Sequence, residues 1–254
     1  MLEKFIRAEL EKKKILLMTH LVLGYPSFDE NYEVIREMAE AEVELVELQI
    51  PFSEPIADGP TILFANQKAI DNRVSVKDCL DFIARVTGDF PGIRFLIMTY
   101  YNILFSYGEE EFIKVAGSKG IHGFIIPDLP PEEGRSYIEA CRKSRLNSIF
   151  IFTPTSTAER LKVLGEVSSG FVYCVGRKGV TGSNTPFDQN LNDQIQRYRE
   201  AVSLPLALGF GVQSKEDVDF LTGKADIAVI GSQLIRIHDQ EGTSAVGNFL
   251  KSVR

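Results

Sequence analysis

Short apolar runs recur eight times along the chain, and amphipathic stretches separate them. Each run is nearly continuous in apolar residues, a pattern typical of strands that are buried on both faces of a parallel sheet. The runs are ILLMTHLVLG (15–24), VELVELQI (43–50), IRFLIMTY (93–100), HGFIIPD (122–128), NSIFIFTP (147–154), GFVYCVG (170–176), LPLALGF (204–210) and ADIAVIGS (225–232). Such repetition restricts the chain to a few α/β architectures.

The stretches between these runs have the apolar spacing of helices. They cover 29–41, 62–71, 75–88, 108–119, 131–144, 157–166, 187–201, 213–222 and 241–253, and an extra helix at 2–12 precedes the first strand. Eight strand and helix units in about 250 residues predict an α/β fold with a single (β/α)₈ TIM barrel. The barrel domain would span 1–254. Periodicity alone leaves a doubly wound open sheet as an alternative.

The charge balance restricts the possible partners. The formal net charge is −7, which argues against a nucleic-acid backbone or an anionic membrane as the main partner. A phosphorylated metabolite stays possible because backbone N–H groups bind phosphate whatever the global charge. The first residues, MLEKFIRAELEKKK, lack the apolar region of a signal peptide, and no apolar run reaches the ~20 residues that span a bilayer. We therefore expect a soluble cytoplasmic protein with reduced cysteines.

The second strand carries an unusual pair of polar residues. Glu47 and Gln49 lie two residues apart and share one face, whereas Val46 and Leu48 share the other. We expect Glu47 and Gln49 to point into the barrel, where a carboxylate is costly unless it is paired or used. A buried structural ion pair is the equally weighted alternative for Glu47. Glu44, on the opposite face near the strand start, is predicted to be a solvated charge.

A second carboxylate follows in the loop PFSEPIADGPTI. Three prolines stiffen this loop, and it ends in Asp58 and Gly59. An ordinary turn is the simplest interpretation of that pair. A rigid loop at the carboxyl end of a strand could instead hold Asp58 over the barrel mouth beside Glu47. Two carboxylates around one pocket suit proton transfer at one atom and charge stabilisation at another.

Glycines follow the last three predicted strands. Loops after the seventh and eighth strands of such barrels, with a short helix N-terminus, often bind phosphate through backbone N–H groups. A dinucleotide fingerprint is the rival interpretation, but its third glycine is missing. The runs are Gly179-Val180-Thr181-Gly182 in the loop-like segment 176–190, Gly209-Phe210-Gly211, and Gly231-Ser232.

The three histidines do not indicate a metal site. His20 is expected to be a hydrogen-bonded core residue of the first strand, His122 lies at a strand start, and His238 is predicted to follow a helix. Their spacing matches no zinc motif. The sequence therefore predicts no metal ligand set.

Several motifs together resemble the tryptophan synthase α family. VELQIPFSEPIADGPTI is similar to the family signature E-L-G-[IV]-P-F-S-D-P-x-A-D-G-P-x-I. MTYYNILF, IIPDLPPEE, FVYCVGRKGVTG, ALGFGV and IGSQLI resemble further family segments in the same order, and the resemblance runs from about residue 2 to 253. Other phosphate-binding barrels of histidine or tryptophan biosynthesis share the glycines but not the second-strand motif.

The resemblance implies roles for particular residues. Glu47 matches the catalytic glutamate and Asp58 the catalytic aspartate, while Thr181 matches a loop threonine that hydrogen-bonds the aspartate. The substrate-binding set that it implies is Tyr173, Thr181, Gly182, Phe210, Gly211, Gly231 and Ser232.

The implied reaction is retro-aldol cleavage of indole-3-glycerol phosphate into indole and D-glyceraldehyde 3-phosphate. The family passes the indole to a β subunit in an α₂β₂ assembly. That partner alone holds pyridoxal phosphate, so no cofactor is expected in this chain.

The sequence departs from the family pattern at five positions. Gln49 replaces glycine, His20 phenylalanine, Glu54 aspartate, Tyr25 aspartate and Ile103 proline. None of these changes removes a catalytic group. Two alternatives stay open: a stand-alone lyase that releases free indole, and a weakly active subunit that serves mainly as an allosteric partner.

Overall fold

The strands form a closed parallel barrel in the computed structural model, which describes residues 2–176, 189–209 and 211–254. Every strand pairing is parallel, and the order is β5-β4-β3-β2-β1-β9-β8-β7-β6. The strands are β1 (Leu16–Val22), β2 (Leu45–Gln49), β3 (Arg94–Met98), β4 (Gly123–Ile125), β5 (Asn147–Ile149), β6 (Ile151–Phe152), β7 (Val172–Val175), β8 (Leu206–Gly209) and β9 (Ile227–Ile230). Only Phe150 separates the two end strands β5 and β6, so the ring closes at this point.

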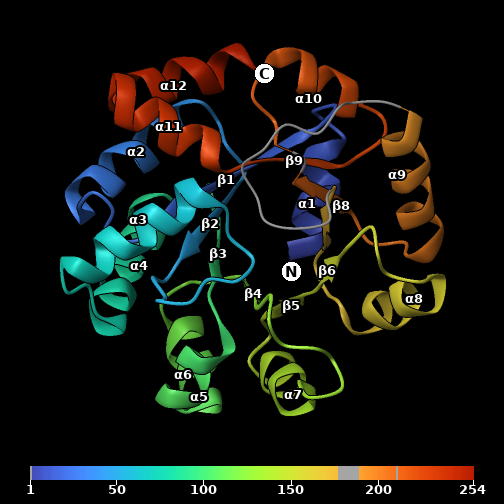
Figure 1. Cartoon of the computed structure of the whole chain (residues 1–254), viewed down its shortest axis with the longest axis horizontal. Helices are drawn as coiled ribbons and strands as arrows, with labels where there is room; N and C mark the ends of the chain where they lie inside the picture. The colour runs from blue at the N-terminus through green and yellow to red at the C-terminus, as the bar shows by residue number, and fades with distance from the viewer. Residues whose placement is uncertain (1, 177–188, 210) are drawn as a thin grey trace.

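Helices surround this barrel, as the sequence predicts (Figure 1). Those of the described residues are α1 (Leu2–Leu10), α2 (Phe28–Glu40), α3 (Pro60–Asp71), α4 (Val76–Asp89), α5 (Tyr101–Tyr107), α6 (Glu109–Ser118), α7 (Arg135–Lys143), α8 (Ala158–Val167), α9 (Gln189–Ala201), α10 (Lys215–Leu221), α11 (Ser232–Glu241) and α12 (Thr243–Ser252). The extra helix α1 lies within the ring of the others (Figure 1). The (β/α)₈ barrel is thereby confirmed.

Because successive side chains point to opposite faces of each strand, the apolar residues form two clusters, one inside the barrel and one outside it. Val46 and Leu48 of β2 belong to the outer cluster, between the strands and the helices. Leu45 belongs to the inner cluster, which also contains Leu2 and Ile6 of α1. Because side chains alternate along a strand, Glu47 and Gln49 lie on the inner face with Leu45, as predicted. The helix α1 covers the amino ends of the strands and leaves the carboxyl ends for the site.

Local capping explains several helix starts. Ser75 and Asp78 form a reciprocal capping box at α4, and Ser214 and Asp217 form another at α10. Ser27 accepts a hydrogen bond from the Glu30 N–H at the start of α2. These side chains satisfy backbone donors that the first helical turn leaves without partners.

The structure differs from the predicted elements in three respects. The helices α5 and α11 were not predicted, and the fifth apolar run forms the two short strands β5 and β6. His238 lies inside α11, not after a helix, where it contacts Glu30 at 3.1 Å. Both missed helices begin directly at the end of a strand-like run, so the continuous apolar sequence hid the boundary.

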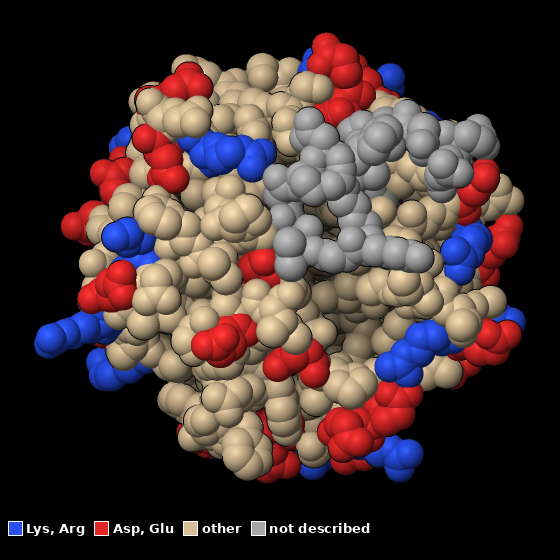
Figure 2. Space-filling model, viewed as in Figure 1, with Lys and Arg blue, Asp and Glu red and all other residues tan. Residues whose placement is uncertain are grey.

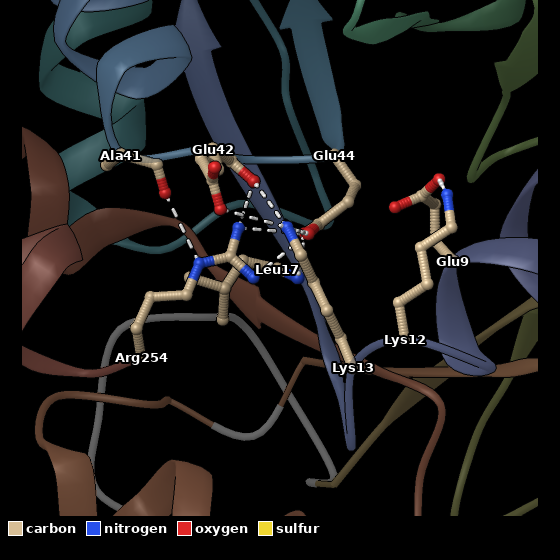
Figure 3. Close-up of polar contacts among 8 residues, drawn as sticks. All are labelled: Glu9, Lys12, Lys13, Leu17, Ala41, Glu42, Glu44 and Arg254. Carbon is tan, nitrogen blue, oxygen red and sulfur yellow. Dashed lines mark hydrogen bonds and ion pairs between the residues drawn. The ribbon is translucent and has the colours of Figure 1, made fainter.

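The prediction that Glu44 is a solvated charge is wrong. Its side chain is only 4% exposed, and Figure 3 shows Lys13 and Arg254 converging on it. Glu44 Oε1 lies 2.6 Å from Lys13 Nζ and 2.9 Å from Arg254 Nη1, while Oε2 accepts the Leu17 N–H at 2.8 Å. The partners come from distant parts of the chain, which the strand pattern alone does not show.

Two further predictions concern the cysteines and the membrane. Cys79, Cys141 and Cys174 are free and buried. None of the helices within the described ranges is long and apolar enough to span a bilayer.

Candidate active site

The inner face of β1 and β2 places His20 beside Glu47. The two residues are direct partners in the parallel register. His20 Nδ1 lies 3.3 Å from Glu47 Oε1, and the residues are only 4% and 3% exposed. Met98 on β3 is the register partner of Gln49, which is fully buried. The strand pairing therefore brings an imidazole, a carboxylate and an amide together near the carboxyl ends of the strands.

The loop after β2 brings Asp58 to the same place. Its fold is held by side chains, since Asn66 Oδ1 accepts the Phe52 N–H at 3.0 Å and the Tyr100 hydroxyl accepts the Ala57 N–H at 3.1 Å. Asp58 itself is 7% exposed. Its Oδ2 accepts Gln49 Nε2 at 2.6 Å and the Tyr100 hydroxyl at 3.2 Å. Asp58 is therefore a buried carboxylate with two convergent donors beside Gln49.

The pKa shifts show that the two carboxylates share one electrostatic environment. Burial raises the pKa of Asp58, and the Glu47 charge adds to this, while His20, Gln49 and Tyr100 act in the opposite direction. For His20, burial disfavours the charged imidazole. Glu47, Asp58 and Gln49 outweigh that effect, so the pKa of His20 lies above its ordinary value of 6.5. Titratable groups that perturb one another in a buried site are typical of functional sites.

Three buried polar atoms of this cluster have no hydrogen-bond partner among the described residues. They are His20 Nε2, Glu47 Oε2 and Gln49 Oε1. A buried polar atom left unpaired costs free energy, and such atoms in a native structure need an explanation. Their gathering beside two carboxylates is what a site for a polar ligand requires.

Tyr173 on β7 joins the cluster from the other side of the barrel. Burial and the charges of Glu47 and Asp58 raise the pKa of Tyr173 well above 10, so its phenol is neutral. A Cβ at Gly209 on the paired strand β8 would lie 3.0 Å from the Tyr173 hydroxyl. Glycine at position 209 therefore makes room for the phenol.

The predicted phosphate site lies at the ends of the last two strands. Gly231 precedes α11, and a Cβ there would lie 3.7 Å from the His20 Cβ. Ser232 is the first residue of α11 and is 9% exposed. Gly211 has φ +78°, the left-handed region that favours glycine. The structure thus brings Gly231 close to His20, while Gly211 follows the neighbouring strand β8.

The start of α11 differs from that of α10. Within the described chain, the first turn of α11 has no acidic residue, and no side chain caps it. The first turn of α10 carries Glu216 and Asp217, and its own capping box occupies its N–H groups. An uncapped helix N-terminus favours an anion through its free N–H groups and its dipole. The N-terminus of α11 is therefore the better candidate for an anion.

Sequence reasoning also left parts of this site unplaced or unrecognised. Thr181, Gly182 and Phe210 lie outside the described residues, and so does the hydrogen bond between Thr181 and Asp58 that the resemblance implies. Tyr100 was not recognised as a site residue. The signal was its position, because inward residues alternate along β3 through Leu96 and Met98 to Tyr100, all in the inner cluster.

The fold and this site define a (β/α)₈ barrel with two buried carboxylates at the carboxyl ends of its strands. No group of three or more His, Cys, Asp or Glu within the described ranges could hold a metal ion. Residues 6–251 match the family model described as tryptophan synthase alpha chain. The chain belongs to this family.

Relatives and solved structures agree over nearly the whole chain. The tryptophan synthase alpha chain of Syntrophotalea carbinolica is 52% identical, and the match covers 100% of both sequences. A structure of Mycobacterium tuberculosis tryptophan synthase superimposes with a TM-score of 0.91 at 29% identity, over 99% of this chain and 96% of that one. A structure of a tryptophan synthase complex from Pyrococcus furiosus gives a TM-score of 0.86 at 27% identity, over 94% and 97%.

Proposed function

We propose that this chain is a carbon–carbon lyase that cleaves indole-3-glycerol phosphate into indole and D-glyceraldehyde 3-phosphate. The observation that carries the proposal is the pair Glu47 and Asp58, buried in one cluster with polar atoms that have no partner among the described residues. Membership of the tryptophan synthase alpha chain family supports the same reaction.

In the proposed mechanism Glu47 moves the protons. The carbon–carbon bond breaks only after indole C3 is protonated, and the glyceryl hydroxyl loses its proton as that bond's electrons return to the ring. Glu47 has one oxygen held near His20 and a second, Oε2, with no partner within the described chain. A free oxygen on an oriented carboxylate suits transfer to and from a bound substrate.

Asp58 is proposed to accept the indole N–H and to stabilise the positive charge that develops there. This role requires an ionised carboxylate. The hydrogen bonds from Gln49 and Tyr100 favour the ionised form against the effect of burial. Gln49 and Tyr100 both donate to one oxygen, Oδ2, and the other oxygen is proposed to accept the indole N–H. Fixed charges aimed at developing charge are a large source of rate enhancement.

The phosphate is proposed to bind where β8 and β9 end. Gly211, Gly231 and Ser232 would supply backbone N–H groups and a hydroxyl, with the uncapped start of α11 favouring the anion. Tyr173 would lie along the bound substrate beside the carboxylates. Thr181, Gly182 and Phe210 complete the proposed set and stay predictions from the family resemblance.

We also propose that the chain itself needs no cofactor. Protonation at carbon and deprotonation of a hydroxyl are acid–base steps that carboxylates perform. Pyridoxal phosphate is expected only in a β subunit that consumes the indole. The proposed place of work is the cytoplasm.

A partner β subunit in an α₂β₂ assembly fits the exposed apolar surface. Large apolar side chains are exposed at the carboxyl ends of β2 and β3, in the loop after β2 and in the helices α3 and α5. They are Ile56, Leu63, Phe64, Phe105 and Tyr107, with exposed fractions from 41% to 73%. Uncharged residues occupy much of the face seen in Figure 2, between scattered charged side chains. Exposed apolar side chains of this size are proposed to contact the β subunit.

A steady-state assay tests the proposal. Purified chain is mixed with indole-3-glycerol phosphate, with and without a β subunit, and indole and D-glyceraldehyde 3-phosphate are measured separately. We expect the two products in equal amounts, and at least about tenfold faster release with the β subunit, which is ~1.4 kcal/mol of barrier. Absence of cleavage under both conditions would overturn the proposed lyase activity. Equal turnover under both conditions, while the complex forms, would favour a stand-alone enzyme.

A further inference from the structure

Two buried polar residues of the site have no part in the proposed acid–base steps. His20 is 4% exposed and Gln49 is fully buried, both on the inner face of the barrel. On this face Met18 precedes His20 on β1, and Leu45 precedes Glu47 and Gln49 on β2, and both Met18 and Leu45 are apolar. Burying an imidazole and an amide among apolar neighbours is costly unless their contacts compensate. Their contacts therefore indicate what they do.

Each of the two residues contacts one carboxylate. His20 Nδ1 lies 3.3 Å from Glu47 Oε1, and Gln49 Nε2 donates to Asp58 Oδ2 at 2.6 Å. Asp58 Oδ2 also accepts the Tyr100 hydroxyl at 3.2 Å. Glu47 Oε2 has no partner among the described residues. At Glu47 a neighbour thus contacts one oxygen while the other has no partner within the described chain and is available to a ligand.

The other polar atoms of His20 and Gln49 have no hydrogen-bond partner among the described residues. His20 Nε2 and Gln49 Oε1 make no hydrogen bond within the described ranges, although one is a possible donor and the other an acceptor. Gln49 nevertheless contributes to raising the pKa of His20, together with Glu47 and Asp58 and against the effect of burial. The remaining titratable neighbours of the cluster, Tyr100 and Tyr173, are neutral phenols. The charged imidazole is thus favoured between the two carboxylates.

We propose that His20 and Gln49 are positioning residues for the cleavage reaction, in which His20 fixes Glu47 for proton transfer and Gln49 fixes Asp58 beside the indole nitrogen. The inference rests on the proposed function. It assigns a role to two positions at which this chain departs from the family pattern. A carboxylate that its neighbours hold in one rotamer spends less time in orientations that cannot react. Such supporting contacts therefore raise turnover.

The test compares conservative and apolar variants in the same cleavage assay, with the β subunit present. His20→Leu removes the donor at similar volume, whereas His20→Asn keeps an N–H near the position of Nδ1. Gln49→Met removes the amide at similar length. We expect His20→Leu and Gln49→Met each to lower kcat by about 10-fold with KM within about 3-fold, because misplacement of a reacting group acts mainly on the chemical step. His20→Asn is expected to recover at least about a third of the original kcat, since it restores the hydrogen bond.

The outcomes separate this inference from the proposed function. If the unaltered chain cleaves the substrate and Glu47→Gln abolishes cleavage, the function stands. A kcat of His20→Leu within about 3-fold of the unaltered chain, or no recovery in His20→Asn, then overturns the positioning role alone. No cleavage by the unaltered chain overturns the function itself. Circular dichroism checks folding, and if His20→Leu fails to fold, Gln49→Met and His20→Asn decide the question by the same kcat and KM criteria.

Discussion

Two glutamates three residues apart, Glu44 and Glu47, are buried to the same degree and have opposite surroundings. Glu44 is 4% exposed and Glu47 is 3% exposed. Two cationic side chains and a backbone N–H satisfy Glu44 at the amino end of β2 (Figure 3). Glu47, toward the carboxyl end, contacts a titratable imidazole through one oxygen and has no partner for the other among the described residues.

Burial alone therefore does not show whether a carboxylate is fully paired within the protein or keeps an oxygen available to a ligand. Lys13, Arg254 and the Leu17 N–H occupy both oxygens of Glu44. Glu47 has a partner whose charge depends on its surroundings, and it retains an unused acceptor. The useful criterion is whether each buried polar atom of the carboxylate has a hydrogen-bond partner within the protein.

The largest expected effect separates the two glutamates by activity. Glu47→Gln is expected to lower the cleavage rate about 10²–10⁴-fold, because an amide cannot carry protons. Its thermal stability and its binding of a substrate analogue should change little. The measurement is steady-state release of indole.

The matched control is Glu44→Gln, which makes the same chemical change at the other end of the strand. Its kcat is expected to stay within about 2-fold of the unaltered chain, since it contacts no reacting group. If Glu47→Gln kept more than about a tenth of the activity, the proton-transfer assignment would be lost.

The second prediction extends the comparison to Asp58. Asp58→Asn keeps the size of the side chain but removes the charge proposed to stabilise the indole cation. We expect a loss of about 10²-fold in kcat, the usual effect of removing one fixed stabilising group. Turnover like that of the unaltered chain would mean that Asp58 and Gly59 form only a structural turn.

The same comparison shows how far the sequence predicts the site. Alternation along one strand was sufficient to direct Glu47 and Gln49 inward, because it depends only on local geometry. The surroundings of Glu44 depend on Lys13, 31 residues away, and on Arg254, 210 residues away. No local pattern contains such contacts, so its burial was not predicted. His20 was expected in the core, but its pairing with Glu47 depends on strand register, which only the fold reveals.

The third prediction separates the two glutamates by stability. Glu44→Gln leaves Lys13 and Arg254 without their anion, but these side chains are 26% and 22% exposed and keep part of their hydration. We therefore expect the free energy of unfolding to fall by about 1–3 kcal/mol, the usual cost of losing a charged hydrogen-bond partner. Chemical denaturation with urea measures it.

Glu9→Gln is the control for this effect. Glu9 pairs with Lys12 at 2.8 Å, but the Lys12 side chain is 66% exposed. Such an exposed pair contributes little to stability, because water and salt screen the two charges. Equal losses in Glu44→Gln and Glu9→Gln would show that the buried cluster adds nothing to stability beyond an ordinary surface pair.

The smallest expected effect concerns the N-termini of the helices α10 and α11 instead of the two glutamates. Ser232 begins the uncapped helix α11, whereas Ser214 caps α10 in a closed box with Asp217. If phosphate binds at α11, Ser232→Ala removes one hydroxyl donor and leaves the backbone donors in place. We therefore expect glycerol phosphate to bind about 3- to 10-fold more weakly, which corresponds to the loss of one hydrogen bond. Isothermal titration measures the affinity.

Ser214→Ala is the matched change at the other helix. It should lower stability by about 1 kcal/mol through the lost cap and leave phosphate affinity unchanged. Substitution at Gly211 would be a poorer test, because its φ of +78° strains any other residue whether or not an anion binds nearby. Weaker binding in Ser214→Ala than in Ser232→Ala would place the anion at α10. In that case, the absence of acidic side chains from the first turn of α11 would not explain which of the two helix N-termini binds the anion.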